Sequence, residues 1–126
     1  MILDLEKALA NKVAPWTNIQ YKCKEFWIFE DGYPVTAGHL LFVPTFETFD
    51  NLMACYAGAY KWGYNGIDLA RWDGFNVGQN IGQASGQTIM YPHVHMIPRR
   101  TGDCEDPRGG VRHVIPNKGN YLNKFN

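Results

Sequence analysis

The sequence predicts an α+β fold with a mainly antiparallel sheet, and three observations support this class. Hydrophobic residues make up 45% of the 126 residues, so a packed globular core is expected. Two segments show the 3.6-residue apolar spacing of helices, and four short segments have the apolar, aromatic or β-branched character of strands. These segments follow the order helix, strands, long helix, strands and irregular tail, which indicates an α+β protein.

The two helices differ in length. Residues 3–12, LDLEKALANK, have apolar side chains on one helical face, and Pro15 closes this first helix. A longer helix is expected from about residue 50 to residue 72, where apolar residues again recur at helical spacing. Three glycines weaken that pattern, so we expect a kink or break near Gly63.

Four segments are predicted to form strands. Residues 24–31, KEFWIFED, end at an Asp-Gly turn, and residues 39–44, HLLFVP, are apolar enough to be buried on both faces. Residues 75–80, FNVGQN, form the third strand, and the glycine loop GQASGQ follows it. The fourth strand covers residues 88–98, TIMYPHVHMIP. The whole chain is expected to be one domain with an irregular tail from about residue 101.

The charge balance excludes some partners. Twelve Lys and Arg balance twelve Asp and Glu, whereas binding to a phosphate backbone needs a basic surplus, so no nucleic-acid partner is expected. A local cluster in the tail would suit a small polyanion or could be a solvated surface. It consists of Arg99, Arg100, Arg108 and Arg112.

The cysteines and the N-terminus bear on the compartment. Cys23, Cys55 and Cys104 are odd in number and widely separated, which is typical of free thiols in a reducing cytosol. The first residues carry acidic side chains and lack the apolar core of a signal peptide. No uncharged apolar run reaches the ~18 residues that a membrane span needs. A cytoplasmic protein without a membrane partner is expected.

The candidate chemistry lies in QTIMYPHVHMIPRR, residues 87–100. On a strand, Tyr91, His93 and His95 share one face, which we expect to look into a cleft, and the apolar residues between them share the other. Such histidines can be structural, can bind a metal, or can act as a nucleophile with a proton donor beside it. A strand-borne metal site would need a carboxylate where this sequence has Arg99 and Arg100. For a nucleophile, the amides of residues 86–88 could hold phosphate oxygens.

Four ordered segments resemble the histidine triad superfamily of nucleotide hydrolases and transferases. The first, GQTIMYPHVHMIPR, reproduces the spacing of the family signature, and DGYPVTAGHLLFVP is similar to the upstream Gly-His segment. GFNVGQNIGQASGQT and GDCEDPRGGVRHVIP resemble the preceding loop and the tail of bacterial members. The resemblance implies a five-stranded antiparallel sheet with one long and one short helix, paired as a homodimer.

The resemblance also implies catalytic roles. His93 matches the central histidine, which forms a nucleotidyl-histidine intermediate, and His95 matches the third histidine, which assists the leaving group. Gln87 matches a polar residue that contacts the phosphate or the bridging atom. As a plain reading of the residues, Gln87 could equally be a surface amide.

Six further positions match substrate contacts of the family. They are Asp31 for the ribose hydroxyls, Phe29 for the base pocket, Asn80, Gly86 and Thr88 for the phosphate, and His39, whose role varies between branches. Each has a structural alternative. Asp31 can cap the Asp-Gly turn, Asn80 can close a turn, Phe29 can be core, and His39 can be a structural histidine.

Two departures from the family pattern stand out. Tyr91 replaces the first histidine of the triad, and Glu47 replaces a histidine that many members carry after the strand-ending proline. Because the first histidine mainly supports the other two, the nucleophile is expected to survive. The implied function is hydrolysis or transfer at the α-phosphate of nucleotide conjugates, with diadenosine polyphosphates as substrates.

Three alternatives stay open: a purine nucleoside phosphoramidase, a nucleotide-binding protein without turnover, and a metal-binding module. The covalent step requires no cofactor and no metal site, although Mg²⁺ can accompany a polyphosphate substrate.

Overall fold

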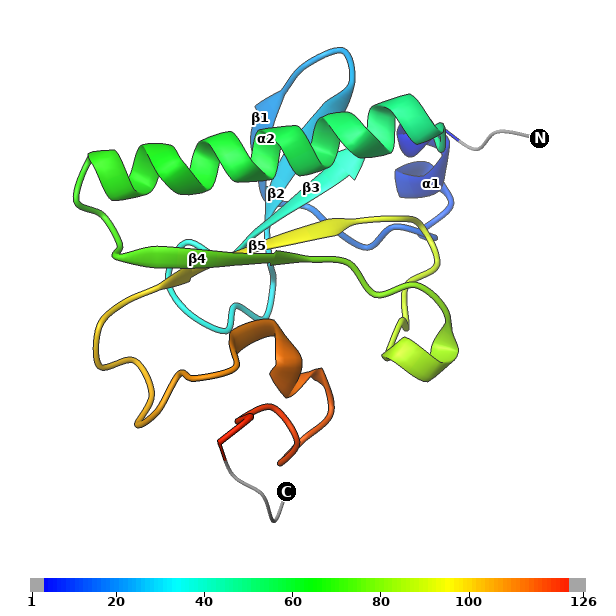
Figure 1. The fold of residues 1–126 in the computed structure, drawn as a ribbon. Helices are drawn as coiled ribbons and strands as arrows, with labels where there is room; N and C mark the ends of the chain where they lie inside the picture. Colours follow the sequence, from blue (N-terminus) through cyan, green and yellow to red (C-terminus); the bar gives the residue numbers. More distant parts are fainter. Residues whose placement is uncertain (1–3, 123–126) are drawn as a thin grey trace.

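The computed structural model describes residues 4–122 and confirms the α+β class. One five-stranded sheet has the strand order β1-β2-β3-β5-β4, and every neighbouring pair is antiparallel (Figure 1). The long helix α2 crosses one face of the sheet, and the short helix α1 packs at the end of the other (Figure 1). The strands are β1 (Ile19–Lys22), β2 (Phe26–Glu30), β3 (Leu40–Pro44), β4 (Gly74–Gly78) and β5 (Val94–Arg99).

Helix α1 (Leu5–Ala10) begins at Asp4, whose side chain accepts a hydrogen bond from the Lys7 amide at 2.7 Å. It ends at Ala10, five residues before Pro15, which was expected to close it, and Asn11 caps its C-terminus. Residue 3 of the predicted helix lies outside the described residues. Leu5 and Ala8 bury the apolar face of α1 against the sheet, as the spacing predicts.

Helix α2 (Phe49–Asp68) runs without interruption, so the break predicted near Gly63 is wrong (Figure 1). Its glycines serve packing instead. A Cβ on Gly63 would lie 2.5 Å from the Phe75 ring, and a Cβ on Gly66 would overlap the Trp72 ring. The indole Nε1 of Trp72 donates to the Gly63 carbonyl oxygen at 2.8 Å. Aromatic side chains therefore lie directly against the helix backbone.

The sheet separates two cores. Ile28, Phe42, Val94 and Met96 face α2, whereas Phe29, Leu41, Val43 and Tyr91 face α1. This alternation places both histidines of the 93–95 pair on the face opposite α2, as predicted.

Strand β5 begins at Val94, later than predicted, because the chain before it leaves the sheet as an irregular segment. The tail contains a short 3₁₀ helix at Gly110–Val114 and is otherwise irregular. Within residues 4–122, no helix is long and apolar enough to cross a membrane.

Three arginines of the tail cluster have partners within the protein. Arg99 forms an ion pair with Asp103 at 2.8 Å and bonds to Asn76. Arg100 donates to the Thr36 hydroxyl and the Ala37 carbonyl, and Arg112 donates to the Gly119 carbonyl. Arg99 and Arg100, at the end of β5, thus hold the loop after β5 and the loop before β3, whereas the contact of Arg112 lies within the tail.

Candidate active site

A cleft of about 430 Å³ opens on the histidine face, a size that fits a small-molecule ligand. Its walls come from the segment before β1, from the turn after β2 and from the glycine loop before β5. His93 and His95 line it together. The predicted orientation of the histidine pair toward a cleft is therefore confirmed.

His93 is buried and lies directly before β5. Its Nδ1 lies 2.8 Å from the backbone oxygen of Tyr91. Because a carbonyl oxygen only accepts, Nδ1 carries the ring proton and Nε2 keeps its lone pair. Burial lowers the pKa of His93 below its usual 6.5, although the Tyr91 carbonyl and Asp31 oppose the shift. His93 is thus a neutral imidazole with a free Nε2.

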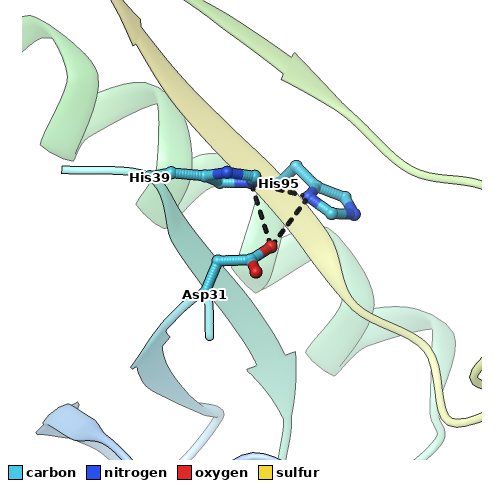
Figure 2. A group of neighbouring side chains, drawn as sticks. All are labelled: Asp31, His39 and His95. Carbon is cyan, nitrogen blue, oxygen red and sulfur yellow. Dashed lines mark hydrogen bonds and ion pairs between the residues drawn. The ribbon is translucent and has the colours of Figure 1, made fainter. Parts of the chain in front are cut away.

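His95 lies on β5 beside His93, with ring centroids 5.3 Å apart. Its Nδ1 lies 2.9 Å from Nε2 of His39, the residue that precedes β3 (Figure 2). Burial, with the positive charge that His93 and His39 would carry if protonated, lowers the pKa of His95 to about 4. His95 is therefore neutral at physiological pH.

Asp31 caps its turn, as the structural alternative predicted, while its contact with ribose hydroxyls stays a prediction. Its Oδ1 accepts a hydrogen bond from the Tyr33 amide at 2.8 Å, which caps the Asp-Gly turn. Its Oδ2 points to the histidines, 3.3 Å from Nε2 of His39 and 4.0 Å from Nδ1 of His95 (Figure 2). Asp31 also lines the cleft, whereas His39, only 2% exposed, lies behind His95.

These three side chains form a possible metal centre. Among residues 4–122 one such group occurs, with the ligating atoms of Asp31, His39 and His95 all within 4.8 Å of one another. Two imidazoles and a carboxylate are a donor set that suits zinc. The Nδ1 atom of His39, however, already accepts a hydrogen bond from the Val35 amide, which places the ring proton on the Nε2 atom that a metal would need.

The side-chain amide of Gln87 is hydrogen-bonded to the backbone of the glycine loop. The Gln87 Oε1 accepts from the Gly82 amide at 2.8 Å, and its Nε2 donates to the carbonyls of Ile89 and Met90. This side chain therefore braces the loop, and its catalytic role stays a prediction. Gly86 has φ +93°, a conformation that favours glycine.

Asn80 and Thr88 fit their predicted positions. Both line the cleft with Gly86, and neither side chain has a hydrogen-bond partner among residues 4–122. Their polar groups can therefore bind a ligand. Their contact with phosphate stays a prediction.

Phe29 lies elsewhere than expected. Its side chain is fully buried in the core beneath α1 and does not reach the cleft, since Trp16 covers it at a ring distance of 5.8 Å. Trp16 itself lines the cleft and packs on the His93 ring at 4.9 Å. Trp16 rather than Phe29 therefore lines the cleft, and a contact with a base there stays a prediction. Sequence reasoning missed Trp16, because it lies between elements and belongs to no periodic pattern.

The side chain of Tyr91 is part of the core and does not face the cleft. It is 1% exposed, and its hydroxyl donates to the Pro44 carbonyl at 2.7 Å, away from the cleft. Burial raises the pKa of Tyr91 well above its usual range, and the nearby carboxylates of Glu47 and Asp4 raise it further. The phenol and Glu47, the two departures noted in the sequence, thus lie in one neighbourhood under α1.

No model of a protein family matches the chain, but single proteins do. An uncharacterised HIT-like protein of Methanocaldococcus jannaschii is 30% identical over 103 residues, which is 76% of this chain and 80% of that protein. An adenylylsulfatase of Arabidopsis thaliana is 35% identical over 81 residues, 59% of this chain and 41% of that enzyme. The crystal structure of a Zn-bound histidine triad family protein from Mycobacterium smegmatis has a TM-score of 0.66 and 27% identity, covering 79% of this chain and 77% of that one.

The sheet, the two helices and the paired histidines over a cleft define a protein of the histidine triad type. The similarity to the Methanocaldococcus jannaschii protein shows that the chain belongs to the HIT-like family.

Proposed function

We propose that this protein is a nucleotidyl hydrolase or transferase that acts at the α-phosphate of nucleotide conjugates. The observation that carries the proposal is the hydrogen bond from His93 Nδ1 to the Tyr91 carbonyl. It leaves Nε2 unprotonated in a cleft, which is the state that a nitrogen nucleophile needs.

In the first step, the Nε2 lone pair of His93 forms a bond to the α-phosphorus while the bond from phosphorus to the leaving group breaks. A phosphate leaving group departs as an anion with that electron pair, and His95 beside it supplies a hydrogen-bond donor. An amine leaving group also takes up one proton from the solvent as it departs, so that it leaves as a neutral amine. In the second step, water attacks phosphorus, the bond to His93 breaks, and the nucleoside monophosphate is released with the water proton lost to solvent. Asn80 and Thr88 would hold the phosphate oxygens.

The charges of the cleft bear on the leaving group. Its lining contains the carboxylates of Glu30 and Asp31 and no lysine or arginine among the described residues. A diadenosine polyphosphate, the first substrate class to test, would therefore need Mg²⁺ to balance its phosphates. This observation favours a second candidate, a purine nucleoside phosphoramidate, whose leaving group is an amine. The adenylylsulfatase among the relatives supports nucleotidyl chemistry in general.

The test is intact-protein mass spectrometry after rapid acid-free quenching with diadenosine tetraphosphate or adenosine phosphoramidate, with product analysis in parallel. We expect an AMP adduct or released AMP that disappears in His93→Ala. The matched control is His113→Ala, an exposed histidine outside the cleft, which should keep the adduct. No adduct and no product from either substrate, with AMP still bound by calorimetry, would identify a nucleotide-binding protein without turnover.

We also propose a homodimer and a cytoplasmic location. The edge strand β4 lies beside exposed aromatic residues of α2, with Tyr60 and Tyr64 rings 4.8 Å apart and Tyr64 5.4 Å from Phe75. An unpaired edge beside apolar rings supports pairing with a second copy, which light scattering would measure. The three free thiols support a reducing compartment.

A further inference from the structure

A backbone amide fixes where the His39 ring carries its proton. The Val35 N–H donates to Nδ1 of His39 at 3.1 Å. Nδ1 must therefore offer a lone pair, and a neutral imidazole then carries its single proton on Nε2. Burial lowers the pKa of His39, so the ring is neutral at physiological pH. A proton on Nδ1 would face the Val35 N–H, donor against donor.

The proton on His39 in turn fixes His95. Nε2 of His39 and Nδ1 of His95 are 2.9 Å apart, and only one of two hydrogen-bonded nitrogens can carry the shared proton. Because Nε2 of His39 has it, Nδ1 of His95 accepts. The proton of His95 is then on its Nε2, the ring nitrogen outside this contact.

Asp31 supports the same arrangement. Its Oδ2 lies 3.3 Å from Nε2 of His39, so the carboxylate attracts the proton to that nitrogen. The Tyr33 amide holds the other carboxylate oxygen in place. The hydrogen bonds therefore run from the Val35 amide to His39 and from His39 to His95. Asp31 lies beside the two histidines (Figure 2).

We propose that His39 is a positioning residue, which fixes the tautomer of His95 so that its Nε2–H is a permanent hydrogen-bond donor to the reacting phosphate or its leaving group. The catalytic part of this inference rests on the proposed function. The tautomer itself depends only on the free protein. A neutral donor of this kind needs no charge on His95, and it cannot take a proton from water at Nε2.

The same proton excludes a metal ion from the Asp31, His39 and His95 group. A metal would need the Nε2 lone pair of His39, which would force the ring proton onto Nδ1 against the Val35 amide. Although a family relative was solved with bound zinc, these three residues do not fit a metal ligand set. The distances among Asp31, His39 and His95 alone would suit a cation, but the proton on Nε2 of His39 lies at that place.

Nitrogen NMR of the free protein tests the tautomers without substrate. In protein labelled with ¹⁵N-histidine, long-range ¹H–¹⁵N correlations distinguish a protonated ring nitrogen from an unprotonated one, and His39→Gln, His93→Gln and His95→Gln spectra assign the signals. At neutral pH we expect the proton on Nε2 in His39 and His95 and on Nδ1 in His93. A proton on Nδ1 of His95, or a ring signal of His39 that moves on addition of one equivalent of Zn²⁺, would overturn the proposal.

Two substitutions test the positioning role. In His39→Gln the amide nitrogen takes about the place of Nε2 and can still donate to His95. In His39→Asn the amide oxygen can still accept from Val35, but the side chain is too short to reach His95. We expect His39→Asn to lower kcat about 10–100-fold with KM little changed, and His39→Gln to keep most of the activity. Equal loss in both variants, or no loss in His39→Asn, would contradict it. Absence of turnover in the wild type would count against the proposed function alone, since the NMR result stands without it.

Discussion

At His93, one hydrogen bond decides which nitrogen can react. The Tyr91 carbonyl takes the Nδ1 proton, so the free lone pair is on Nε2 in the cleft. Two residues along, His95 has the opposite tautomer, because His39 donates to its Nδ1. Neighbouring histidines on one face thus have opposite tautomers, which suits the proposed roles of a nucleophile and a donor. The backbone sets the tautomer at both ends, directly at His93 and through His39 at His95.

The role of Tyr91 can be tested by removing only its hydroxyl. Tyr91→Phe leaves the Pro44 carbonyl without its buried partner, so we expect the free energy of unfolding to fall by about 1–2 kcal/mol in urea titrations. The AMP adduct on His93 should persist, because the backbone carbonyl that orients its ring is unchanged. Tyr121→Phe, on an exposed ring, is the control and should leave stability unchanged. Loss of the adduct in folded Tyr91→Phe would give the phenol a part in catalysis.

At the scale of elements, α2 shows why its glycines led to the wrong prediction of a break near Gly63. Periodicity and propensity treat a glycine in a helix as a weak point. In α2 the missing side chains admit the rings of Phe75 and Trp72, which come from the following loop and strand. Such contacts are long-range, and no local pattern encodes them.

Gly66→Ala tests that packing. Alanine favours the helix by about 1 kcal/mol, but its Cβ would overlap the Trp72 ring. Overpacking of a rigid core typically costs about 1–3 kcal/mol, so we expect net destabilisation and a lower Tm by calorimetry. Asn65→Ala, exposed on the same helix, should instead gain a few tenths of a kcal/mol from propensity alone. If Gly66→Ala were as stable as Asn65→Ala, the ring would not be packed against the helix.

Elements with strong local patterns were predictable, and the others were not. Strand β3 has a continuous apolar run, and β5 has the alternation that placed His93 and His95 on one face. Strand β1 was missed because all four of its residues are exposed on an edge, which leaves no burial pattern to detect. Trp16 lies between elements, and its packing on His93 is a tertiary contact. His39 was named from the sequence, but its contact with His95 joins residues far apart in the chain and follows only from tertiary packing.

At the scale of the whole molecule, the two faces of the sheet have different environments. The α2 face is packed with aliphatic and aromatic side chains. The opposite face is shared between a smaller core under α1 and the cleft, so its histidines are partly withdrawn from water. Burial of three imidazoles in one region disfavours their charged forms, and the stability of the fold must depend on pH as a result.

The expected dependence has a definite sign. The folded-state pKa values of His39, His93 and His95 all lie below the value of 6.5 for an unfolded chain, and that of His95 is about 4. Between these values the unfolded chain binds more protons, so acid favours unfolding. Stability is fully present above pH 6.5 and is lost as the pH falls toward 4, with a slope of up to about 1.4 kcal/mol per pH unit for each histidine.

Urea unfolding at pH 7, 6 and 5 measures this slope. The low pKa of Asp103, which its bond to Arg99 causes, acts only below this window, since an unfolded aspartate titrates near 3.8. His95→Gln removes one of the three groups, so its stability should fall less steeply with acid than that of the wild type. If the free energy of unfolding stayed level or rose between pH 7 and pH 5, the histidines would have to be protonated and positively charged in the folded state as well. That result would also count against a neutral His93, and so against its proposed role as nucleophile, because burial is the cause of both the lowered pKa and the pH dependence.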